Sequence, residues 1–353
     1  MTSPVRPGPS NTLTDVAGLR VGHHQRIGDG WLTGTTVVVA PPGGAVAGVD
    51  VRGGGPGTHE TDVLDPRNLV ERVHAIVLGG GSAYGLAAVA GVMDRLADAG
   101  IGFPVGTEPG QVVPIVPAAV LFDLGRGGDF RATPGPAFGA AAYDAATDDP
   151  VALGTIGAGT GAVAGGIKGG IGSASAVVAG VTVGALAVVN AVGSTVDPTT
   201  GELYGTRFGL AGEFDGLRPP DQRERTAALE AAQAPAAAAG RGVAESFHTT
   251  IGVLATDATL TKAQCQKLAG IGHDGMARAI RPVHSMFDGD TVFALASCAG
   301  PSLDPPAFNA VLAAAADAFT RAVAHGILAA DSVGRHHAYA DLCPSAVQQW
   351  RRR

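Results

Sequence analysis

Short apolar runs recur along the chain and are typical of buried strands. The runs lie at Thr35–Ala40, Ala75–Leu78, Ala176–Asn190, Thr249–Thr256 and Thr291–Ser297. The run at 176–190 is long enough for one or two strands. Between the runs, apolar residues recur at the spacing of one helix face, which predicts helices over Leu86–Leu96, Leu260–Ile280 and Pro306–Leu328. Interleaved strands and helices predict α and β structure packed in layers.

Polar residues and glycines mark the ends of these elements. We expect Ser82 to cap the first helix and Gly100 to stop it. Thr259 or Thr261 is expected to open the second helix. Residues 212–247 are rich in Ala, Pro, Arg and Glu, which predicts an exposed connector with a short helix at 223–233. An ordinary linker between two domains is the alternative for this segment.

Composition narrows the class of protein. Of the 353 residues, 46% are apolar and 16% are charged, enough to bury a large core. The 54 glycines lack a Gly-X-Y repeat and indicate tight turns and close backbone contacts. A formal charge of −7 argues against a nucleic-acid partner. Three cysteines without a CxxC pair predict reduced thiols.

The sequence gives little reason to expect a membrane partner. Its first residues have no apolar signal-peptide core. The stretch from Ile171 to Val196 is uncharged, but its many Gly, Ser and Thr residues and its strand-like alternation argue against a membrane helix. We therefore expect a soluble, cytoplasmic protein.

Several common catalytic motifs are missing from the sequence. It has no GxSxG elbow, no GxxxxGK[ST] phosphate loop and no HExxH helix. The pairs His23-His24 and His336-His337 are adjacent residues that do not share one face of a helix or strand, so we expect no metal site there. The segment 157–162 only weakly resembles a dinucleotide fingerprint, because the four glycines within residues 165–170 would break the helix that should follow. No cofactor is expected.

Three places retain candidate chemistry. Lys168 lies in a glycine-rich loop that either brings it to a reacting centre or leaves it on the surface. Thr249 begins a buried strand directly after the connector. If the chain were cut before it, the free α-amine of Thr249, with a pKa of about 7.7–8.0, would be a base for its own hydroxyl. Asp288 and Asp290, separated by a glycine, suit a metal, the orientation of a nucleophile, or a plain turn.

Together these segments resemble the DmpA-type aminopeptidases, a family of self-processing N-terminal-nucleophile enzymes that includes β-peptidyl aminopeptidases and nylon-oligomer hydrolases. The similarity runs from about residue 12 to 335, with the motifs in family order. The matching motifs are Arg52-Gly-Gly-Gly-Pro-Gly-Thr58 with Glu60-Thr-Asp62, Gly79-Gly-Gly-Ser-Ala-Tyr-Gly85, Val113–Ala119, Gly157–Ala162, Lys168-Gly-Gly-Ile-Gly-Ser-Ala-Ser175, His248–Ala258 and Phe287–Ala294.

The resemblance implies an α+β fold, a four-layer αββα sandwich, with residues 1–353 as one domain. It implies one internal cut between His248 and Thr249, giving a larger piece (1–248) and a smaller piece (249–353) that stay associated. Thr249 would be the nucleophile and Asn190 the oxyanion donor, with Lys168, Asp288 and Asp290 completing the site. No metal or cofactor is implied. We expect a small peptide or amide as substrate and a homotetramer of αβ units.

Three positions depart from the family pattern. His248 stands where many relatives have Asn before the nucleophile, and Gly165 where the β-peptidyl branch has Tyr. The glutamate that binds the substrate amine in that branch is replaced near Ala118. The sequence therefore favours an amide hydrolase or aminopeptidase. The alternatives are a non-cleaving αββα binding or assembly protein and a related acyltransferase.

Overall fold

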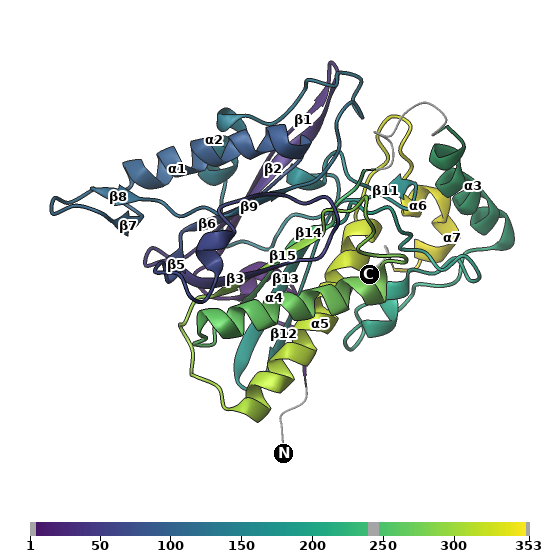
Figure 1. Ribbon diagram of the computed structural model, residues 1–353. Helices are drawn as coiled ribbons and strands as arrows, with labels where there is room; N and C mark the ends of the chain where they lie inside the picture. Colours follow the sequence, from purple (N-terminus) through teal and green to yellow (C-terminus); the bar gives the residue numbers. More distant parts are fainter. Residues whose placement is uncertain (1–4, 239–246, 351–353) are drawn as a thin grey trace.

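Two β-sheets lie face to face in the middle of the computed structural model, which describes residues 5–238 and 247–350 (Figure 1). The larger sheet has the strand order β12-β13-β14-β15-β3-β5. Its strands are β12 Ile171–Val178, β13 Val181–Val188, β14 Ile251–Thr256, β15 Thr291–Ala296, β3 Ala45–Val51 and β5 Arg72–Val73. Strands β14 and β15 run parallel, and the other neighbours run antiparallel.

The smaller sheet has the order β1-β2-β6-β9-β4. Its strands are β1 Arg20–Gly28, β2 Trp31–Val39, β6 Ala75–Gly79, β9 Ala118–Val120 and β4 Gly57–His59. Two short ribbons flank the sheets and pair β7 Phe103–Pro104 with β8 Val112–Val113, and β10 Val163–Ala164 with β11 Ile167–Lys168.

Helices cover the outer face of each sheet (Figure 1). Helices α4 Lys262–Ala279 and α5 Pro305–Leu328 pack on the larger sheet, and α1 Ala88–Asp98 and α2 Pro136–Asp144 pack on the smaller one. Buried apolar side chains fill three layers: one between each sheet and its helices, and a central one between the sheets that contains Leu186, Phe293 and Ile76. The predicted α+β, four-layer αββα sandwich is therefore confirmed.

Helix ends follow the predicted signals with one exception. Thr261 caps α4, and its hydroxyl accepts a hydrogen bond from the Gln264 N–H. Gly100 follows the end of α1 with φ +67°, a conformation that glycine adopts without strain. The prediction that Ser82 caps α1 is wrong. Ser82 instead begins a 3₁₀ segment, Ser82–Ala87, with φ +50°, and its N–H donates to Leu121 O just after β9.

The uncharged segment at 171–196 forms a hairpin rather than a membrane helix. Strands β12 and β13 are joined by Ala179 and Gly180, which both have positive φ, the geometry of a type I′ turn. Helix α5 is long and apolar enough to cross a membrane by length and composition, but 89% of its most apolar window is buried in this fold. The apolar surface of α5 therefore packs against the larger sheet.

The connector differs from its prediction. Helix α3, Gln222–Ala238, is longer than the expected helix at 223–233 and lies beside α6 Tyr339–Leu342, close to α7 Pro344–Val347 (Figure 1). The start of the connector is only partly exposed: Gly212 and Asp215 are exposed, but the Glu213 side chain is buried against Arg321 at 2.6 Å and His325 at 3.0 Å. A buried guanidinium needs a paired carboxylate, and Glu213 of the connector forms that ion pair with Arg321. Residues 239–246, which the sequence also assigns to the exposed connector, lie outside the described part of the chain.

This buried pair predicts a pH-dependent contribution to stability. Burial would raise the pKa of Glu213, but hydrogen bonds from His325 and Arg321 outweigh it and lower the pKa from 4.5 to about 2. The folded state therefore gains stability from this carboxylate above about pH 4.5 and loses it as the pH falls toward 2. Glu213→Gln should lower the free energy of unfolding at pH 7 by about 3 kcal/mol, because it leaves a buried cation unpaired.

Urea unfolding of wild type and Glu213→Gln at several pH values measures this effect, with exposed Glu108→Gln as the control. The difference between wild type and Glu213→Gln should shrink as the pH falls from 4.5 toward 2. A difference that is absent at pH 7, or that grows in acid, contradicts the assignment.

Candidate active site

The ends of three neighbouring strands bring the predicted site residues together. Val188, the last residue of β13, pairs with Ile251, the first residue of β14. Asn190 and Thr249 continue this antiparallel pairing, and the Thr249 N–H donates to Asn190 O at 2.8 Å. Strand β15 begins at Thr291 beside β14, so the preceding turn with Asp288 and Asp290 reaches the same place. Both Thr249 and Asn190 are buried.

The Thr249 hydroxyl lies against the peptide bond that precedes it. Its Oγ1 donates a hydrogen bond to His248 O. The Gly289 N–H donates to Thr249 Oγ1 at 3.0 Å and to His248 O at 3.2 Å. One backbone donor therefore contacts both the hydroxyl and the carbonyl oxygen of the bond before it.

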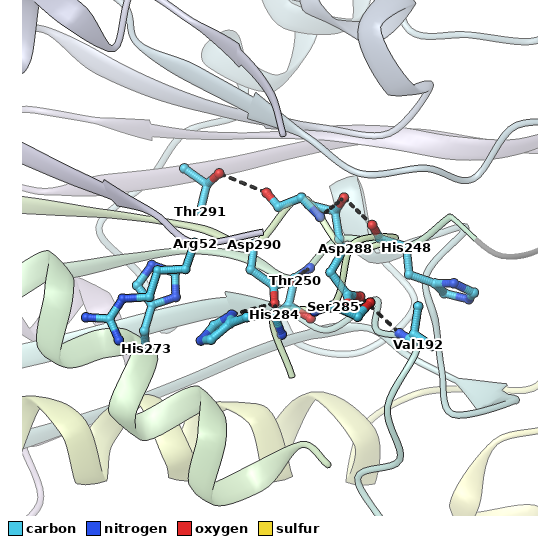
Figure 2. A network of polar contacts seen from close by, with 12 residues as sticks. Arg52, Val192, His248, Thr250, His273, His284, Ser285, Asp288, Asp290 and Thr291 are labelled. Carbon is cyan, nitrogen blue, oxygen red and sulfur yellow. Dashed lines mark hydrogen bonds and ion pairs between the residues drawn. The ribbon is translucent and has the colours of Figure 1, made fainter. Parts of the chain in front are cut away.

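The two aspartates hold the backbone on either side of this point (Figure 2). Asp288 accepts hydrogen bonds from Val192 N at 3.2 Å and from the N–H and hydroxyl of Ser285. Asp290 accepts from Thr250 N at 2.8 Å. Burial, followed by the negative charge of Asp290, raises the pKa of Asp288.

These contacts refine the role predicted for the acids. We expected Asp288 and Asp290 to orient the nucleophile, and the structure shows the Thr249 hydroxyl bonded to the Gly289 N–H between them. The Asp288 and Asp290 side chains are two residues apart in an extended segment and point to the same side. The Gly289 N–H between them is directed at the start of β14. The acids instead fix Thr250 and Val192, which are neighbours of Thr249 and Asn190 in the chain. In the described residues, no cluster of His, Cys, Asp and Glu is placed to hold a metal ion.

Two histidines that the sequence analysis did not single out complete this side of the site. His284 bonds Asp290 through both its N–H, at 3.1 Å, and its Nδ1, at 2.8 Å. The His273 ring packs edge-on against the His284 ring at 4.7 Å (Figure 2). Burial lowers the pKa of His273 to about 4, so this ring is neutral at pH 7. The Asp290 carboxylate is thereby fixed between Thr250 and His284.

Asn190 is oriented by a second residue that sequence reasoning missed. Its Oδ1 accepts from Arg126 Nη1 at 2.6 Å and from Val163 N at 3.0 Å. Both partners can only donate, so they fix the amide with its Nδ2 group as the donor. Nδ2 lies 3.4 Å from Phe122 O. Arg126 is a lone basic residue in a glycine-rich stretch, which offered no recognisable motif.

Lys168 is buried near Asn190 but is held by other groups. Its Nζ donates to Gly159 O at 2.9 Å and to Gly169 O at 2.7 Å. Its strand partner Val163 is the residue that donates to Asn190 Oδ1. Burial, and then the positive charge of Arg126, lowers the pKa of Lys168 to about 7. The ammonium is thus poised to lose its proton near neutral pH, and the alternative of an exposed surface lysine is wrong.

The glycine-rich loop after β3 supports the acidic turn from behind. Arg52 N donates to Asp290 O at 3.0 Å, and Gly55 N donates to Asp288 O at 2.9 Å. A Cβ on Gly53 would lie 2.2 Å from Asp290 N, so this approach requires glycine. The motif at 52–58 therefore positions the acidic turn through its backbone.

Comparisons with known proteins agree with this architecture. An L-aminopeptidase D-Ala-esterase/amidase from Ochrobactrum anthropi, described as a variant of the Ntn hydrolase fold, superposes with a TM-score of 0.69 at 23% identity, covering 98% of this chain and 96% of that one. A Burkholderia sp. beta-aminopeptidase superposes with a TM-score of 0.68 at 24% identity, covering 99% and 97%. The chain thus has the fold of the N-terminal-nucleophile hydrolases.

Sequence comparison places the chain within one family of that class. The model of peptidase family S58 matches residues 11–339, so the chain belongs to peptidase family S58. An uncharacterised aminopeptidase from Mycobacterium tuberculosis is 50% identical over 95% of this chain and 99% of its own length. A 6-aminohexanoate-oligomer endohydrolase from Kocuria sp. is 31% identical over 83% and 77%. The predicted DmpA-type resemblance is confirmed, and the chain is a hydrolase of the peptidase class.

The contacts of Asp290 predict the effect of removing its charge. Asp290→Asn keeps the size of the side chain but turns one acceptor into an NH₂ group that faces N–H donors of Thr250 or His284. We expect a loss of at least about tenfold in any reaction of Thr249, with little change in fold. Circular dichroism and a rate assay measure the two effects, and exposed Asp98→Asn is the control. Unchanged rates would show that the pair is only a structural turn.

Proposed function

We propose that the chain cuts itself between His248 and Thr249, and that the new N-terminal Thr249 then hydrolyses amide bonds in small peptides or amides. The contact between Thr249 Oγ1 and the His248 carbonyl is the single observation that supports this most directly. This contact places the hydroxyl beside the carbonyl group whose carbon it would attack. The Gly289 N–H, shared by both oxygens, is a donor for the charge that develops.

The first stage is an acyl transfer within the chain. Thr249 Oγ1 attacks the carbonyl carbon of His248 and its proton moves to the departing Thr249 nitrogen. The C–N bond breaks and an ester joins His248 to Oγ1. Water then opens the ester, leaving a carboxylate on His248, a free hydroxyl on Thr249 and a free α-amine. During attack the negative charge falls on His248 O, where the Gly289 N–H donates at 3.2 Å.

The second stage uses the same hydroxyl on a substrate. The Thr249 nitrogen already lies 2.8 Å from Asn190 O, a contact that would orient the free amine toward its own hydroxyl. The amine takes the proton of Oγ1 and returns it to the leaving amine of the substrate. Asn190 Nδ2, fixed by Arg126 and Val163, would donate to the substrate oxyanion. Lys168, whose pKa is about 7, would favour the neutral amine through its positive charge when it is protonated.

The sheet order supports continued association of the two pieces. Strands β14 and β15 belong to residues 249–353, and they lie between β13 and β3 of residues 1–248. Separating the pieces would break two ladders of backbone hydrogen bonds and expose the central apolar layer. We therefore propose that the cut molecule keeps one αββα core.

The first prediction is the cut itself. Purified protein should give two bands on a denaturing gel, corresponding to residues 1–248 and 249–353, and Edman reading of the smaller should begin Thr-Thr-Ile-Gly. Thr249→Ala should stay intact because it has no hydroxyl, and Thr249→Ser should still be cut. One intact band from wild type after long incubation at 37 °C would favour a non-cleaving binding protein instead.

Substrate class gives a second prediction. The carboxylates of Asp288 and Asp290 are engaged with Ser285, Val192, His284 and Thr250, so they offer no free anchor for a substrate ammonium. We expect only a modest preference for an amino-acid p-nitroanilide over its N-acetyl form, compared by kcat/KM on the cut protein. A loss of about 10³-fold on acetylation would reveal an amine anchor and a strict aminopeptidase. Faster release with an added amine acceptor would indicate acyltransfer.

A further inference from the structure

The residue before His248 is held by aromatic side chains on both sides. The Phe247 ring lies 5.8 Å from the Phe122 ring and 5.9 Å from the Phe287 ring, measured between centroids. These distances and the tilted and edge-on orientations are typical of favourable aromatic pairs. Phe247 is therefore packed between two side chains from different parts of the chain.

Both aromatic partners belong to segments that form the site. Phe122 O lies 3.4 Å from Asn190 Nδ2, the group that we assign to the substrate oxyanion. Phe287 directly precedes Asp288, and Phe287 O accepts a hydrogen bond from His248 N at 3.0 Å. The aromatic contact is thus one residue upstream of the bond that Thr249 attacks.

The backbone before the cut is bound as a substrate would be. His248 forms a parallel bridge with Asp288, in which His248 N donates to Phe287 O and His248 O accepts from Gly289 N. Figure 2 shows the His248 ring directed away from the two aspartates. A substrate residue in the place of His248 could make the same two backbone bonds, whatever its side chain.

Exposed apolar side chains lie around the turn that binds the His248 backbone. Among the exposed large apolar side chains are Met286 at 76%, Phe287 at 46% and Val192 at 36%. Met286 and Phe287 lie in the turn before Asp288, and Val192 N is bonded to the Asp288 carboxylate. Exposed apolar groups gathered at one place often mark a binding surface.

We propose that Phe122 and Phe287 form a subsite for an aromatic or large apolar group one residue upstream of the scissile amide. In the uncut chain Phe247 occupies it. The mature enzyme would therefore accept substrates that extend beyond the residue next to the cut bond, such as acylated dipeptide amides, and cut them internally. This inference rests on the proposed function. Phe247 and His248 resemble the acyl part of a substrate only if Thr249 attacks the His248 carbonyl in the uncut chain and the substrate amide in the cut enzyme.

The test compares three p-nitroanilides on the cut protein: N-acetyl-Phe-His, N-acetyl-Ala-His and His. We expect kcat/KM to be about tenfold higher for the Phe than for the Ala compound, a typical discrimination by an apolar subsite. In Phe122→Ala this ratio should fall to about one, whatever happens to the absolute rates. Exposed Leu69→Ala should keep the wild-type ratio. Equal rates for the Phe and Ala compounds in wild type, or an unchanged ratio in Phe122→Ala, would overturn the subsite.

A second variant keeps the inference testable if Phe122→Ala folds poorly. Phe247→Ala should slow self-cleavage about tenfold, and Phe247→Leu should restore most of the rate because it again fills the space. Equal rates of cleavage in all three chains would contradict the subsite. If the His compound is hydrolysed but kcat/KM is no higher for the N-acetyl-Phe-His compound than for the N-acetyl-Ala-His compound, only this inference is contradicted. An uncut chain that turns over none of the compounds would overturn the proposed function as well.

Discussion

The site depends on backbone hydrogen bonds between the turn at 287–290 and the start of β14. Phe287 O, Gly289 N and the N–H of Thr291 bind His248 and Thr250, and they set the position of Thr249 between them. Because β14 and β15 run parallel, the turn before β15 must end beside the residues before β14. The hydroxyl and the carbonyl that it contacts are thus placed by sheet register rather than by flexible side chains, which favours a fixed reaction geometry.

Charged side chains are distributed unevenly around the paired strand ends that hold Thr249 and Asn190. On one side, the carboxylates of Asp288 and Asp290 are satisfied by backbone N–H groups, Ser285 and His284. On the other side, the partly buried Arg126 and the buried Lys168 lie near Asn190 and donate to carbonyl and amide oxygens. Each group is costly to bury alone, so these contacts hold the surrounding loops in one arrangement. The reacting residues therefore lie between the two aspartates of the turn and a mixed group of charges made by Arg126, Lys168 and Asp123.

Much of the fold and part of the site could be predicted from the sequence. Apolar runs located β14 and β15, and helical spacing located α4 and α5, because these elements bury one continuous apolar face. The motifs indicated Thr249, Asn190 and the acidic turn. The role of the Gly289 N–H could not be predicted, since a backbone donor leaves no trace in residue type. Arg126 and Glu213 were missed because their partners, Asn190 and Arg321, are distant in the chain. Ser82 was misjudged because a 3₁₀ segment, Ser82–Ala87, separates it from the start of α1 at Ala88.

Self-cleavage should begin with transfer of the His248 acyl group to the Thr249 hydroxyl, before water reacts. Hydroxylamine attacks esters far faster than peptide bonds, so the uncut chain should be incubated with it and the pieces weighed by mass spectrometry. We expect a piece ending at His248 that carries a hydroxamate in place of the carboxylate, with none in Thr249→Ala. A piece that ends only in a carboxylate, formed at the same rate with and without hydroxylamine, would contradict an ester on Thr249.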